Sequence, residues 1–231
     1  MALDDDGARP QLIETIFVPR GAEERAVRRG LAQAGSSIRV VATGIGPLAA
    51  AHAADEALAA ASFGTALSTG LCGALSPSFV VGDTLVYREL VREGASPIAL
   101  DRALAESVAG RLPGSQSGVR GIAGDTILTS VEQKRAAAAR YRADAVDMES
   151  FALAERLGRA GVAVAVVRIA SDAIGDDLPD LNRALDGSGG IDSLALALAM
   201  LSRPFAAVAL ARNGTRALAA LERIVRQLAA S

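Results

Sequence analysis

The sequence predicts an α/β fold with a largely parallel or mixed sheet. Short apolar runs rich in Val and Ile alternate with longer runs of helical periodicity. Glycines cluster just after the expected strand ends, where they permit positive φ and close approach of a ligand to the backbone. The chain has 231 residues, of which 51% are hydrophobic and only 3% aromatic. We therefore expect one domain with a core of Ala, Val, Leu and Ile.

The elements follow from these patterns in order. Residues 1–11 are expected to be a disordered leader and 12–231 a single domain, with C-terminal helices from about 191 onwards. Strands are expected at 13–18, 38–42, 65–68, 84–87, 119–123 and 162–167. Helices are expected at 23–31, 48–61, 100–112, 131–142, from about 149 onwards, and at 192–201 and 204–227.

The segment from Ala145 to Asp172 carries the strongest indication of function. An amphipathic run with Glu149 in its first turn precedes an apolar strand that ends at Asp172. Because ligands of open α/β sheets bind at the carboxyl ends of strands, both acids are expected at a binding edge. They could hold a polar substrate and donate a proton to it. The alternatives are a helix-capping or Arg168-pairing role for Asp172 and an ordinary first-turn position for Glu149.

Other motifs give weaker indications. Glu23 and Glu24 follow the first strand, and one of them could activate water. The glycines of 44–46 and 70–73 are expected in turns, and 69–73 in particular is expected to be a turn after a short strand. Neither continues into a phosphate-binding Gly-Lys-Ser/Thr or a full dinucleotide motif.

The composition excludes several classes of function. The net charge of −2 implies no bulk attraction to nucleic acid. One cysteine and one histidine exclude an intrachain disulfide and a multi-His or Cys-based metal site, and we expect no cofactor. The acidic, polar N-terminus is unlike a signal peptide, and no apolar run is long enough to span a bilayer. These features favour a cytoplasmic protein.

The motifs GIGP, STGLCGALSPSFVVGD, GDT, VDMES and VVRIASD occur together in one order. In this the chain resembles the nucleoside phosphorylase-I superfamily over about residues 13–180. It is most similar to methylthioadenosine/S-adenosylhomocysteine nucleosidase-like and hopanoid-associated phosphorylase-like proteins. The resemblance implies a three-layer α/β/α sandwich around a central twisted mixed β-sheet. It also implies cleavage of an N-glycosidic bond through an oxocarbenium-like transition state.

The resemblance also implies roles for individual residues. Asp172 matches the acid that protonates purine N7, or hydrogen-bonds to it, and Ser171 would orient it. Glu149 matches the acid that binds the ribose hydroxyls. The remaining matches are Met148 under the sugar, Glu23 (less well Glu24) as the acid that activates water, and Gly46 and Gly70 in loops lining the site.

Three positions depart from the family pattern. Ser68 and Leu71 stand where the phosphorylases bind phosphate, which favours hydrolysis, although Arg20 is an alternative phosphate ligand. Ile127 stands where an aromatic residue stacks on the purine. The leading hypothesis is therefore hydrolysis of a purine nucleoside, adenosyl with a 5′ substituent. A phosphate-dependent phosphorylase and a catalytically weak nucleoside-binding protein remain alternatives.

The expected partners are a small-molecule nucleoside and further copies of the chain. The resemblance favours a homodimer, with a hexamer as the alternative. The two C-terminal helices carry Ala/Leu faces and several arginines, a pattern that also occurs in helices lying on anionic membranes. Core packing and a subunit interface are the favoured explanation.

Overall fold

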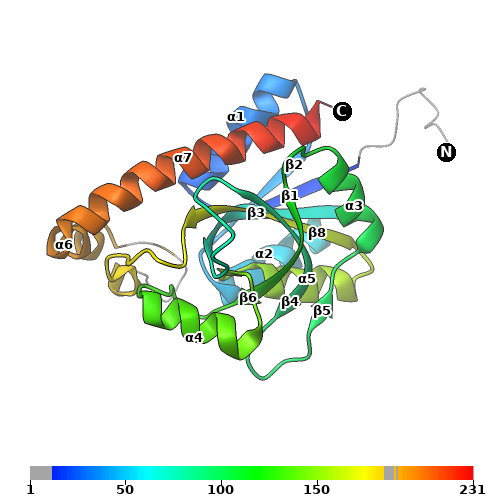
Figure 1. Cartoon of the computed structure of the whole chain (residues 1–231). Coiled ribbons are helices and arrows are strands. Elements are labelled where there is room, and N and C mark those ends of the chain that lie inside the picture. Colours follow the sequence, from blue (N-terminus) through cyan, green and yellow to red (C-terminus); the bar gives the residue numbers. More distant parts are fainter. Residues whose placement is uncertain (1–11, 185–189, 191, 231) are drawn as a thin grey trace, which may run out of the picture.

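The computed structural model describes residues 12–184, 190 and 192–230. The predicted leader at 1–11 lies outside the described residues, as does part of the loop before the C-terminal helices. The predicted α/β/α sandwich around a mixed sheet is confirmed (Figure 1).

Eight strands form one sheet, and part of it closes on itself. β3 pairs with β8 in parallel, β8 with β4 antiparallel, β4 with β6 in parallel, β6 with β7 in parallel, and β7 with β3 antiparallel. These five strands therefore form a ring, to which β1 and β2 add in parallel beside β3, while β5 adds to β4. The strands are β1 (Thr15–Pro19), β2 (Arg39–Thr43), β3 (Thr65–Ala74), β4 (Thr84–Val91), β5 (Ile98–Ala99), β6 (Gln116–Ala123), β7 (Ala145–Asp147) and β8 (Ala163–Asp172).

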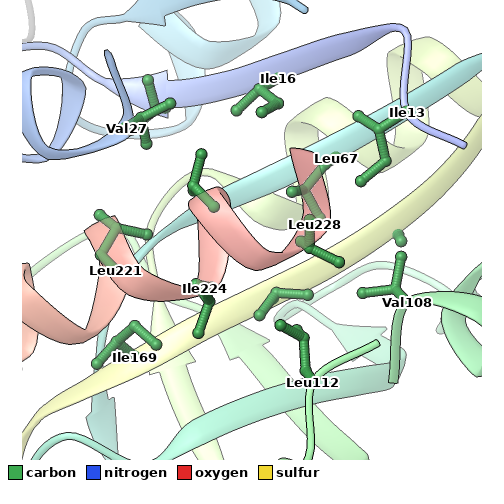
Figure 2. Close-up of a cluster of buried hydrophobic side chains, with 14 of the residues drawn as sticks. Ile13, Ile16, Val27, Leu67, Val108, Leu112, Ile169, Leu221, Ile224 and Leu228 are labelled. Carbon is green, nitrogen blue, oxygen red and sulfur yellow. The ribbon is translucent and has the colours of Figure 1, made fainter. Parts of the chain in front are cut away.

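Helices cover both faces of this sheet. On one face α1, α3 and α7 pack in a cluster of buried aliphatic residues that includes Ile16, Leu67 and Ile169 (Figure 2). On the other, α2 and α5 bury alanines and leucines against Phe17 and Tyr87. The helices are α1 (Ala22–Ala34), α2 (Pro47–Ala60), α3 (Arg102–Gly110), α4 (Val131–Tyr141), α5 (Ser150–Arg159), α6 (Ser193–Ser202) and α7 (Pro204–Ala229), with a 3₁₀ turn at Leu181–Ala184.

The prediction of a turn at residues 69–73 is wrong, because β3 runs unbroken through Ala74. Pairing with β8 continues from Thr65 to Gly73, with a register shift between Cys72 and Gly73. Glycine lowers strand propensity, and two glycines in five residues suggested a turn. In the structure they mark places where polar side chains come close to the backbone.

The segment around residues 145–149 also differs from its prediction. Ala145–Asp147 form the short strand β7, and Glu149 is the residue that caps α5 instead of lying within its first turn. A three-residue strand is too short to show a period of two. Within the described residues, none of the helices is both long and apolar enough to cross a membrane.

Candidate active site

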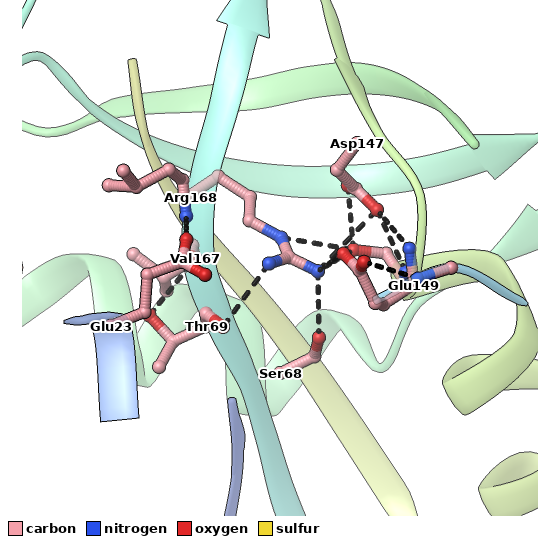
Figure 3. A network of polar contacts seen from close by, with 10 residues as sticks. Glu23, Ser68, Thr69, Asp147, Glu149, Val167 and Arg168 are labelled. Atoms are coloured by element: carbon pink, nitrogen blue, oxygen red, sulfur yellow. Dashed lines mark hydrogen bonds and ion pairs between the residues drawn. The ribbon is translucent and has the colours of Figure 1, made fainter. Parts of the chain in front are cut away.

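A completely buried arginine lies in the middle of the polar network in Figure 3. Arg168 belongs to β8, within a run of buried apolar residues. Its Nε and Nη2 donate to Ser150 Oγ at 3.2 and 2.9 Å, its Nη1 donates to Thr69 O at 3.2 Å, and its Nη2 also reaches Ser68 Oγ at 3.3 Å. The strand predicted at 162–167 therefore continues to Asp172 and includes a buried charge.

Two buried carboxylates neutralise Arg168. Its Nη2 lies 3.4 Å from Asp147 Oδ1 and 3.7 Å from Glu149 Oε2. Asp147 also accepts the backbone N–H groups of Glu149 and Ser150, at 3.0 and 2.8 Å, and so fixes the start of α5. Burial disfavours the charged guanidinium, but the two carboxylates outweigh it and raise the pKa of Arg168. Burial in turn raises the pKa of Glu149, against the opposing effect of Arg168.

A third carboxylate, that of Glu23 at the start of α1, points into the same network. The residue is half-buried, but its Oε1 accepts the backbone N–H of Leu71 at 2.6 Å. Burial of this carboxyl end, and then the nearby charge of Glu149, raise the pKa of Glu23 to about 7. Glu24 instead pairs with Arg28 at 2.8 Å on the outer side of the helix. Of the two candidate acids, the structure brings only Glu23 to the network, which we call the carboxylate cluster: Glu23, Asp147, Glu149 and Arg168.

Two predicted glycines lie against this cluster. A Cβ on Gly70 would stand 2.6 Å from Arg168 Nη1 and 3.2 Å from Glu23 Oε1, and its φ of +146° disfavours other residues. Gly46 donates its N–H to Glu149 Oε1 at 2.9 Å. The same Gly46 lies near Met148, whose Cε would be 3.8 Å from an added Cβ. At both glycines the backbone therefore lies close to a carboxylate of the cluster.

Asp172, the last residue of β8, is buried at the other end of the candidate site. Ser171 Oγ lies 2.7 Å from Asp172 Oδ1 and can donate to it. Asp172 Oδ2 lies 2.6 Å from Nζ of Lys134, a residue of α4. The counter-ion of Asp172 is thus Lys134. Arg168, which the sequence suggested as a partner of Asp172, pairs instead with Asp147 and Glu149.

Loops on this side are held together by hydrogen bonds between distant segments. Asn182 binds the backbone of Ile127 twice, accepting its N–H at 2.8 Å and donating to its carbonyl at 2.9 Å. Leu178 N–H donates to Thr129 O at 2.8 Å, and Val131 N–H donates to Asp177 at 3.0 Å. We call this part the base-side loops: residues 124–130 and 173–184, with Lys134 and Asp172.

The structure therefore brings most predicted site residues to two places. Glu23, Glu149, Gly46, Gly70 and the backbone of Leu71 meet at the carboxylate cluster, whereas Asp172, Ser171 and Ile127 lie at the base-side loops. Arg20, directly after β1, is exposed. In the described part of the chain, no group of three or more His, Cys, Asp or Glu side chains could hold a metal ion.

Sequence reasoning missed Arg168, Asp147, Lys134 and Asn182 as members of the site. Two of them left a signal in the sequence. Arg168 interrupts an apolar strand, and a buried charge requires a partner. Lys134 is the only lysine among the 24 Lys and Arg residues of the chain.

The fold is that of a nucleoside phosphorylase-type α/β domain. The family model of the Phosphorylase superfamily matches residues 5–201, and the chain belongs to this family. The resemblance inferred from the motifs is thereby confirmed. No curated protein matches the sequence.

Solved structures of nucleosidases are similar in fold. Futalosine hydrolase of Helicobacter pylori is 17% identical with a TM-score of 0.69, and the match covers 93% of this chain and 95% of that one. The 5′-methylthioadenosine/S-adenosylhomocysteine nucleosidase of the same organism is 16% identical with a TM-score of 0.69, and the match covers 93% of this chain and 96% of that one. The corresponding enzyme of Neisseria meningitidis, in complex with methylthio-immucillin-A, is 16% identical with a TM-score of 0.69. This match covers 94% of this chain and 99% of that one. At these identities the likeness establishes the fold alone.

Proposed function

We propose that the protein hydrolyses the N-glycosidic bond of a purine ribonucleoside, adenosyl with a 5′ substituent. The observation that carries this proposal is the pairing of Arg168 with buried carboxylates while the carboxyl of Glu23 has a pKa of about 7. A base with a pKa near the working pH is well suited to take a proton from water. Support also comes from the proteins of similar fold, which are nucleosidases.

The arrangement suits a nucleoside lying along the end of β8. Arg168 and Asp172 are four residues apart on this strand, roughly 13 Å at most in an extended backbone. A ribose over the carboxylate cluster would offer its hydroxyls to Glu149, with Met148 beneath the sugar and the attacking water beside Glu23. The purine would then lie against Ile127 with its N7 near Asp172 and Ser171.

Water is favoured over phosphate as the nucleophile because of the charge of the cluster. Three acids face one arginine there, so a phosphate dianion would meet an excess of negative charge. Ser68 is already engaged by Arg168, and Leu71 contributes a backbone N–H that Glu23 accepts.

The test is to incubate the protein with methylthioadenosine, S-adenosylhomocysteine, adenosine and futalosine, with and without phosphate, and to measure release of the base. We expect release without phosphate, and its loss in Asp172→Asn. Strict dependence on phosphate, with ribose 1-phosphate as product, would instead establish a phosphorylase. Calorimetric binding without turnover over hours would establish a nucleoside-binding protein.

A further inference from the structure

Lys134 is a fully buried basic residue to which the proposed hydrolysis gives no role. Its side chain is 0% exposed, and it is the only lysine among 24 basic residues. Nζ contacts three oxygens: Asp172 Oδ2 at 2.6 Å, Asp176 O at 2.7 Å and Ala173 O at 2.9 Å. The two carbonyl oxygens accept hydrogen bonds from Nζ and the carboxylate is its counter-ion, so these contacts suit an ammonium group.

This ion pair changes how Asp172 can work as an acid. A carboxylate paired with an ammonium has no proton to donate. Its Oδ1 is held by Ser171, and among the described residues its Oδ2 has Lys134 as counter-ion without a well-angled hydrogen bond. Such hydrogen bonds often align only when the substrate binds. The proton that a leaving purine requires must therefore come from beyond Asp172.

We propose that Lys134 supplies this proton through Asp172 and so acts as the positioning and proton-supplying residue of the proposed hydrolysis. A proton passes from Nζ to the Asp172 carboxylate and from it to purine N7. The C1′–N9 bond breaks with its electron pair going to the base, which leaves neutral. Water adds to C1′ and gives its proton to Glu23, and proton exchange with solvent restores Glu23 and Lys134.

The surroundings of Lys134 fit both ends of this transfer. After losing one proton, the amine keeps two N–H groups, and the carbonyls of Ala173 and Asp176 accept them. An arginine could carry the charge but could not release a proton near neutral pH. This difference gives a physical reason for a lysine at this one position in a chain that otherwise uses arginine.

The inference rests on the proposed function, and its test separates the two. Two substrates are compared in Lys134→Met and Lys134→Arg: a purine nucleoside that the native protein cleaves, and 4-nitrophenyl ribofuranoside, whose leaving group needs no proton. We expect both variants to lose about 10²-fold in kcat on the purine nucleoside and to keep the nitrophenyl rate within about threefold. Equal losses on both substrates, or full activity of Lys134→Arg, would overturn the proposal.

A second measurement does not depend on activity or on the folding of Lys134 variants. Because the chain has one lysine, lysine-specific ¹⁵N labelling gives a single side-chain signal in the native protein. We expect Asp172→Asn to shift this signal, and Asp55→Asn, which removes an exposed acid of α2 beside Arg156, to leave it unchanged. An unchanged Lys134 signal in Asp172→Asn would contradict the ion pair between these two residues. If the native protein cleaves no nucleoside, the proposed function is wrong, and the ¹⁵N measurement still tests the ion pair of Lys134 and Asp172.

Discussion

The carboxylate cluster and the base-side loops lie toward the two ends of the candidate site, but they are held in different ways. In the cluster, side chains from α1, β7, β8 and the start of α5 converge on one buried guanidinium. In the base-side loops, backbone groups of two irregular segments are joined through Asn182 and Lys134. Removing one of several buried charges that neutralise one another leaves the others without a counter-ion, which strongly lowers stability. Loops held by a few hydrogen bonds should tolerate single substitutions better.

The largest effect is expected from Arg168→Met. This change leaves Asp147 and Glu149 buried without their counter-ion, so we expect a loss of about 3–5 kcal/mol in the free energy of unfolding. Urea denaturation followed by circular dichroism measures it. Arg28→Met, which removes an exposed pair with Glu24, is the control and should cost less than about 1 kcal/mol. A small loss in Arg168→Met would show that the cluster is not what stabilises this half.

Glu23→Gln should mainly affect the rate. The amide keeps the shape but cannot take a proton from water, so we expect kcat to fall by about 10²–10⁴-fold. Steady-state kinetics on the nucleoside found to be cleaved gives this value. Glu24→Gln, one residue further on and facing Arg28, is the matched control and should retain the native kcat. Equal losses of kcat in the two variants would contradict the role of Glu23 as the base.

Gly70→Ala tests the close approach within the cluster. The new Cβ would collide with Arg168 Nη1, and the backbone would be strained at φ +146°, so we expect a destabilisation of about 1–3 kcal/mol. Thermal unfolding reports it. Gly158→Ala in α5 meets no atom within 4 Å and should be neutral or slightly stabilising. A harmless Gly70→Ala would mean that the cluster can rearrange.

The pH dependence of kcat/KM should reflect Glu23. Its carboxyl must be ionised to act as a base, so activity should fall about tenfold per pH unit below the pKa of about 7. The sign for stability is opposite. The acid ionises near 4.5 in the unfolded chain but near 7 in the folded one, so its contribution to stability falls as pH rises between these values. An acid limb that stays near pH 7 in Glu23→Gln would assign it to another group.

The smallest effect is expected from Asn182→Ala on the base-side loops. Two hydrogen bonds to the backbone of Ile127 are lost at a partly buried site, so we expect a stability cost of about 1–2 kcal/mol. KM for the nucleoside should rise more than kcat falls, because the wall against the base loosens while the cluster stays intact. Asn213→Ala in α7 serves as control. A loss in kcat alone would show that these loops do more than hold the base.

Sequence patterns anticipated the α/β class, most elements and the acids at the strand ends. Glu149 and Asp172 could be found because each follows or ends an apolar run, and Glu23 because it follows the first strand. The motif order then supplied the family, which the family model confirms. The continuous β3 was missed because glycine in a strand gives the same signal as glycine in a turn.

The sequence by itself determined where apolar runs become strands and helices, and that acids stand at their ends, because periodicity records burial within one element. Only the tertiary structure decided which charges meet. Arg168 pairs with Asp147 and not with nearby Asp172, and Lys134 reaches Asp172 from another helix. The closure of β3, β8, β4, β6 and β7 into a ring is likewise set by pairing between distant segments. The partner of a buried charge depends on such packing, which local sequence does not encode.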